Sequence, residues 1–146
     1  MIQEDLYREL NELIAAERRC LFHRLIESTV FVSASESADL EFVRRTAGEH
    51  EAHLGRLIET LIRLGGEPVP GRGDIHSADF HFVDMHILWP RVRAREQELA
   101  DRFERAAARL DDWPEVLLLV REIAGRHRAC AEYVGKWCGV GVSSFE

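Results

Sequence analysis

The sequence predicts an all-α protein that folds as one four-helix bundle over residues 1–146. Three observations support this prediction. Four long stretches repeat apolar residues every three or four positions, and no stretch alternates in the manner of a strand over more than a few residues. The chain has 146 residues, a usual size for one domain, and its 46% hydrophobic and 31% charged residues are typical of a globular one.

The first two helices are expected over about residues 3–31 and 38–64. The first carries apolar residues at helical spacing, namely Leu6, Leu10, Leu13, Ile14, Leu21 and Leu25. A serine-rich break follows, in which Ser37 can cap the second helix. That helix should end at Gly65-Gly66, because glycine adopts the left-handed conformation that commonly terminates helices.

The other two helices are expected over about residues 78–110 and 113–137. Pro90 falls inside the first of them, and proline removes a helical hydrogen bond, so we expect a kink near this position. Pro114 suits the first turn of the last helix. The glycine-containing tail 138–146 is expected to be loose.

The connection between the two helical hairpins indicates their arrangement. Residues 65–76 form the longest Gly/Pro-rich stretch. Fully extended, 12 residues reach at most about 40–43 Å, and a 27-residue helix is about 40 Å long. The stretch can therefore act as a crossover along the bundle, which favours up-down-down-up helices. The alternative is an up-down-up-down bundle.

Several classes of function are excluded by composition. The formal net charge of −7 argues against a nucleic-acid partner. The longest uncharged apolar run is Val116–Val120, too short for a membrane span or a signal-peptide core. The three cysteines are an odd number in a chain without an export signal, which favours the cytoplasm. No glycine-rich phosphate loop, Ser-His-Asp order or Cys-x-x-Cys pair is present, so no nucleotide cofactor is expected.

Each predicted helix places one ionisable residue within its apolar stripe, near mid-length. These residues are Glu17, His50, Glu96 and His127, and His53 shares the face of His50. Burying such groups unpaired is costly, so we expect them to meet one another or a cation. Carboxylate and imidazole groups at a bundle centre are ligands for iron, zinc or manganese. The alternative is that these residues bind no metal and form two buried Glu–His hydrogen bonds, which fix the register of the helices.

The two hairpins also share a local pattern. Gly48-Glu49-His50-Glu51-Ala52-His53 and Gly125-Arg126-His127-Arg128-Ala129-Cys130 both read Gly-x-His-x-Ala, followed by His or Cys. Cys130 therefore stands where the first copy has His53. We nevertheless expect Cys20 and Cys130 to be small buried core residues rather than metal ligands or redox thiols.

On these residues the chain resembles the ferritin-like superfamily, which includes bacterioferritin and rubrerythrin, over about residues 5–137. The segment His53–Pro68 is similar to the second helix and exit of such proteins. Glu17 matches their helix-1 carboxylate, and His53 matches the histidine of the first Glu-x-x-His. The resemblance implies a metal centre at the middle of the bundle.

The chain departs from this family at both bridging carboxylates. The glutamates of the two Glu-x-x-His motifs fall on His50 and on Ala124. Three alternatives are left for the middle of the bundle: a mononuclear metal site, an altered dinuclear site, or an inherited metal position that is empty.

We therefore expect a metal-binding ferritin-like protein, iron- or redox-related, with ligands among Glu17, His50, His53, Glu96 and His127. The alternative is a non-catalytic scaffold or interaction module with a decayed metal site. A homodimer or higher homo-oligomer is expected from the frequency of isologous dimers. The sequence leaves open whether the protein is an enzyme.

Overall fold

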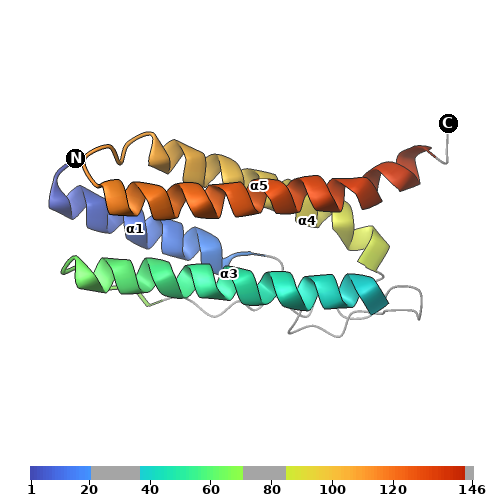
Figure 1. Ribbon diagram of the computed structural model, residues 1–146, viewed down its shortest axis with the longest axis horizontal. Helices are drawn as coiled ribbons and strands as arrows, with labels where there is room; N and C mark the ends of the chain where they lie inside the picture. The colour runs from blue at the N-terminus through green and yellow to red at the C-terminus, as the bar shows by residue number, and fades with distance from the viewer. Residues whose placement is uncertain (21–36, 71–84, 144–146) are drawn as a thin grey trace.

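The structure is a computed structural model that describes residues 1–20, 37–70 and 85–143. These residues form four helices: α1 (Gln3–Arg18), α3 (Ser37–Arg63), α4 (Met85–Ala107) and α5 (Pro114–Ser143). The helices lie alongside one another in an elongated bundle (Figure 1), and these ranges contain no β-strand. The prediction of an all-α, four-helix protein is confirmed. No helix in the described ranges is long and apolar enough to span a membrane.

The start of α1 meets the ends of both α3 and α4. The Tyr7 hydroxyl donates a hydrogen bond to the carbonyl of Leu64, directly after α3. Arg102, in the second half of α4, donates to Glu9 over 2.7 Å. Helix α1 is therefore antiparallel to both, and α3 and α4 run in the same direction, as Figure 1 shows.

After α3 the chain turns back along α1. The amide of Val69 donates to the side-chain oxygen of Asn11 over 2.8 Å. The Val69 carbonyl accepts a hydrogen bond of 3.1 Å from Arg18, in the last turn of α1. Residues 64–69 thus pass from the start of α1 towards its end. Residues 71–84 of this connection lie outside the described residues.

The predicted end of α3 at Gly65-Gly66 is present. Gly65 has φ +98°, a left-handed conformation that other residues rarely adopt. Its amide donates to the carbonyl of Ile62, and the amide of Gly66 donates to that of Leu61 over 2.9 Å. These two bonds form a Schellman motif, which satisfies carbonyls left free at the end of the helix.

Two apolar clusters form the core, and along α1, α3 and α5 buried polar side chains lie between them. Together with Glu96 of α4 these side chains form the polar layer, which comprises Glu17, His50, His53, Glu96 and His127. One cluster includes Leu6, Leu10, Leu13, Leu57, Leu61, Phe103, Val120 and Ile123. The other includes Ala16, Val43, Ala47, Leu88, Trp89, Val92, Leu99 and Val134. Each fully buried large side chain contributes about 1.5–3 kcal/mol. The apolar clusters therefore hold the polar layer in place.

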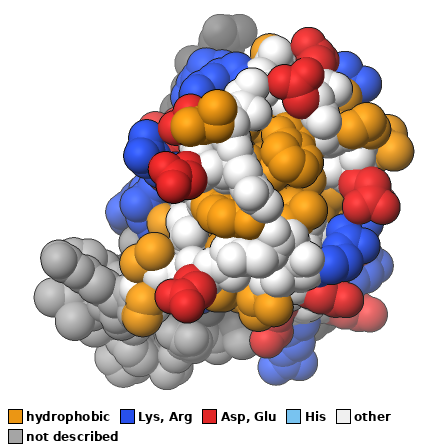
Figure 2. All heavy atoms as spheres, turned by 90° about the vertical axis from the view of Figure 1, so that its left-hand side faces the viewer, with side chains coloured by type: hydrophobic (Ala, Val, Ile, Leu, Met, Phe, Trp, Pro, Cys, Tyr) orange, Lys and Arg blue, Asp and Glu red, His pale blue; other side chains and the backbone are white. Residues whose placement is uncertain are grey.

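The end of the bundle at which α1 and α5 begin is shown in Figure 2. Hydrophobic side chains gather in the middle of this face, and acidic and basic side chains surround them. The first apolar cluster extends towards this end, where Met1, Tyr7, Leu64 and Trp113 pack against it half-buried.

Helix α1 is shorter than predicted. It ends at Arg18, and the amides of Arg19 and Cys20 donate to the carbonyls of Ala16 and Glu17. These i to i−3 bonds tighten and close the helix. They place the Cys20 thiol against Glu96, a tertiary contact that the periodicity of the first helix did not predict. Predicted helical residues 21–31 lie outside the described residues.

The last helix extends beyond its predicted end at residue 137, into the tail that was predicted to be loose. Helix α5 continues to Ser143 through Gly139 and Gly141. Glycine lowers helix stability by about 1 kcal/mol but ends a helix only where the backbone turns left-handed. Among the described glycines only Gly65 does so. Helix α4 contains Pro90, as predicted, and the kink near it stays a prediction.

Candidate metal centre

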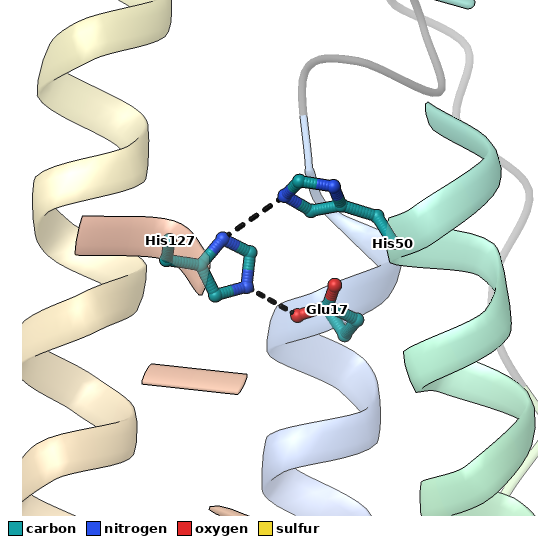
Figure 3. A group of neighbouring side chains, drawn as sticks. All are labelled: Glu17, His50 and His127. Carbon is teal, nitrogen blue, oxygen red and sulfur yellow. Dashed lines mark hydrogen bonds and ion pairs between the residues drawn. The ribbon is translucent and has the colours of Figure 1, made fainter. Parts of the chain in front are cut away.

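Four of the five predicted site residues meet at the polar layer of the bundle. Glu17 comes from α1, His50 from α3, Glu96 from α4 and His127 from α5, and each is at most 2% exposed. Figure 3 shows the His127 ring between Glu17 and His50. Every helix described here thus contributes one ionisable side chain, as the apolar stripes predicted.

His127 donates hydrogen bonds to two carboxylates. Its Nε2 lies 2.7 Å from Oε2 of Glu17, and its Nδ1 bonds to Oε2 of Glu96. Burial lowers the pKa of His127, but the bonds to Glu17 and Glu96 outweigh it and raise the pKa to about 9. At neutral pH the ring is therefore an imidazolium, since only that form donates from both nitrogens.

Glu96 is held in its ionised form at the centre. Burial raises its pKa, but hydrogen bonding to His127 prevails and the pKa falls to about 2. Its other oxygen, Oε1, accepts a hydrogen bond from the thiol of Cys20 over 3.4 Å. Glu96 thus carries its charge at neutral pH between an imidazolium and a thiol.

His50 is oriented by the backbone of its own helix. Its Nδ1 lies 2.7 Å from the carbonyl of Thr46, which can only accept, so Nδ1 donates this hydrogen bond. Its Nε2 lies 3.1 Å from Nδ1 of His127 and 3.3 Å from Oε2 of Glu96. Nε2 of His50 therefore faces the centre.

Glu17 has an unused oxygen. Its side chain is fully buried, and Oε1 has no hydrogen-bond partner among the described residues. An unsatisfied buried carboxylate oxygen is costly, and a cation would satisfy it. One ligand atom each of Glu17, His50 and His127 lies within 4.8 Å of the others, so these three residues fit a metal ion.

A second group of donors contains Cys20, which sequence reasoning assigned to the core. Ligand atoms of Cys20, His50 and Glu96 lie within 4.8 Å of one another, and all three side chains are buried. Cys20 follows Glu17 by three residues, a spacing that places both on one side of a helical turn. That spacing is the signal that could have identified it.

His53 is not part of either group within the described ranges. It lies one helical turn after His50, is 9% exposed, and its Nδ1 has no hydrogen-bond partner in that part of the chain. Burial lowers the pKa of His53, so the ring is neutral at pH 7. His53 as a ligand stays a prediction.

A surface pocket leads towards the centre between α3 and α5. Its volume is about 180 Å³, and His50 and the buried Thr46 and Cys130 belong to its wall. Arg126 also lines it and pairs with Glu49. The pocket offers an approach for a small ion or molecule to the His50 side of the centre.

Comparison with protein-family models, with curated proteins and with solved structures found no match. The function is therefore argued from the geometry of the site. That geometry comprises a buried imidazolium between two carboxylates, a second imidazole whose Nε2 faces inwards, and an unsatisfied carboxylate oxygen.

Proposed function

We propose that the protein is a metal-binding four-helix bundle of the ferritin-like type, with Glu17, His50 and His127 as ligands of one divalent transition metal. The observation that carries the proposal is the unsatisfied, fully buried Oε1 of Glu17 beside two imidazoles. A mixed oxygen and nitrogen donor set suits iron, zinc or manganese. Iron or manganese would add redox chemistry, and zinc would not.

The surroundings of the ligands support this proposal. The Thr46 carbonyl orients His50 through its Nδ1, as backbone carbonyls often orient metal-binding histidines. Glu96 accepts from His127 and orients that ring. Ligation requires His127 to release one ring proton, because the imidazolium has a hydrogen on each nitrogen.

The ferritin-like crossover is supported by the direction of the helices. Helices α3 and α4 run the same way, and residues 64–69 return along α1. A connection of this direction along the bundle is what the crossover requires.

The alternative is a helical scaffold whose metal site has decayed. One observation favours it: His127 already satisfies both Glu17 and Glu96 through hydrogen bonds. In that case the polar layer would hold the helices in register without any ion.

Metal analysis of untagged, full-length protein distinguishes the two. The proposal expects about one equivalent of a transition metal as purified, or after addition of Fe(II), Mn(II) or Zn(II), with a higher melting temperature. His50→Leu should abolish that rise, and His53→Leu on the same helix tests whether His53 is also a ligand. If the wild-type protein takes up none of these ions and its melting temperature does not change, the proposal is wrong and the scaffold hypothesis is supported.

A further inference from the structure

Cys20 lies inside the polar layer, facing a carboxylate. It is fully buried, and its thiol donates to Oε1 of Glu96 over 3.4 Å. Its position follows from the end of α1, where its amide donates to the Glu17 carbonyl. The thiol thus faces the ionisable centre, although Cys20 also belongs to the apolar cluster that contains Leu88 and Val92.

His50 and Glu96 bring two further donor atoms close to this thiol. Ligand atoms of Cys20, His50 and Glu96 lie within 4.8 Å of one another, and all three side chains are buried. The bond from Nδ1 of His50 to the Thr46 carbonyl directs Nε2 towards the centre, and Oε1 of Glu96 faces the thiol. A cation among these groups would take one sulfur, one nitrogen and one oxygen ligand.

We propose that Cys20, His50 and Glu96 bind Zn(II) at a position distinct from that formed by Glu17, His50 and His127. Thiolate, imidazole and carboxylate are the three ligand types that zinc takes in proteins. The inference rests on the proposed function in that His50 serves both positions. Since Nε2 of His50 has one lone pair, only one of the positions is occupied at a time, and the sulfur ligand assigns zinc to this one.

Charge favours this position for a divalent ion. Binding of Zn(II) displaces the thiol proton of Cys20 to solvent and forms one Zn–S bond. The thiolate and the Glu96 carboxylate then neutralise the two positive charges, which suits a buried site. The bond between Glu17 and His127 stays intact, and Glu96 keeps one oxygen for His127. Three protein ligands leave a fourth coordination position open.

Co(II) provides a spectroscopic probe of the sulfur ligand, because Co(II) substitutes for Zn(II) and a thiolate ligand adds a sulfur-to-cobalt charge-transfer band in the near ultraviolet. The reduced, full-length protein is titrated with Co(II), and then with Zn(II) to displace it. We expect the band in the wild type and its loss in Cys20→Ser. The matched controls Cys130→Ser and Cys138→Ser should keep it.

X-ray absorption at the zinc edge of the wild-type protein gives a second measurement that needs no variant. We expect one sulfur neighbour together with nitrogen and oxygen. Bound zinc with nitrogen and oxygen neighbours alone would overturn the inference and leave the proposed metal site standing. Persistence of the cobalt band in Cys20→Ser would do the same. Failure of both Zn(II) and Co(II) to bind would overturn the inference, and failure of Fe(II) and Mn(II) to bind as well would overturn the proposed function.

Discussion

The imidazole of His127 and the carboxylate of Glu17 meet with Nε2 and Oε2 2.7 Å apart, although 110 residues separate them along the chain. The carboxylate of Glu96 accepts a hydrogen bond from the other nitrogen of the same ring, Nδ1. The imidazolium therefore acts as an internal cation between two buried carboxylates. A proton and a metal ion compete for this ring, and the pH-dependent predictions follow from that competition.

The metal-free protein should be most stable in mildly acidic solution. The pKa of His127 rises from 6.5 to about 9 on folding, so its contribution is present below pH 6.5 and is lost as pH rises through about 9. The pKa of Glu96 falls from 4.5 to about 2, so its contribution is present above pH 4.5 and is lost as pH falls through about 2.

Both shifts describe one hydrogen-bonded pair and count once, on the order of 3 kcal/mol. Urea unfolding in the presence of a chelator, across acidic to alkaline pH, measures this. His127→Gln should flatten the dependence on the alkaline side. A wild-type free energy of unfolding that stays constant from pH 6.5 to 9 would contradict the assignment of the imidazolium.

Metal affinity at the position formed by Glu17, His50 and His127 should rise with pH. Ligation displaces one proton from a ring whose pKa is about 9, so affinity increases about tenfold per pH unit up to that value. Titration calorimetry with Mn(II) on Cys20→Ser isolates this position from the sulfur ligand. An affinity independent of pH would show that His127 is not a ligand.

Replacing the two histidines by leucine should have different effects on the metal-free protein. His127→Leu removes the hydrogen-bond partner of both Glu17 and Glu96, and leaving buried charges unpaired costs about 3–5 kcal/mol. His50→Leu removes only the longer contact of 3.3 Å with Glu96 and leaves the bonds of His127 to both carboxylates in place, so the loss should be smaller. Thermal melts with a chelator compare the two variants. Equal destabilisation would show that the two rings contribute alike to the centre.

Arg102 should matter more for stability than other surface arginines. It donates to Glu9, which is 5% exposed, and to Glu12. Arg102→Met leaves Glu9 poorly satisfied and should cost about 1–3 kcal/mol. Arg128→Met is the matched control, because its partners Asp101 and Glu104 are exposed, and it should cost at most about 1 kcal/mol. Chemical unfolding measures both, and equal losses would contradict the argument.

Local physics determined much of the fold from the sequence alone. The apolar spacing of 3.6 residues per turn predicted the four helices and the residues that interrupt their apolar faces. The conformational freedom of glycine predicted the end of α3 at Gly65. Glu17, His50, Glu96 and His127 were found because an ionisable side chain on an apolar stripe must be buried with it.

Only the tertiary structure decided which neighbours of these residues join the centre. His53 follows His50 by three residues, as Cys20 follows Glu17, and sequence spacing treats the two alike. Cys20 faces the centre because α1 closes with tight i to i−3 bonds and α4 brings Glu96 against the thiol. His53 remains one turn beyond both donor groups found in the described ranges. Helical periodicity defines a face to within one side chain, whereas ligand geometry depends on how neighbouring helices pack.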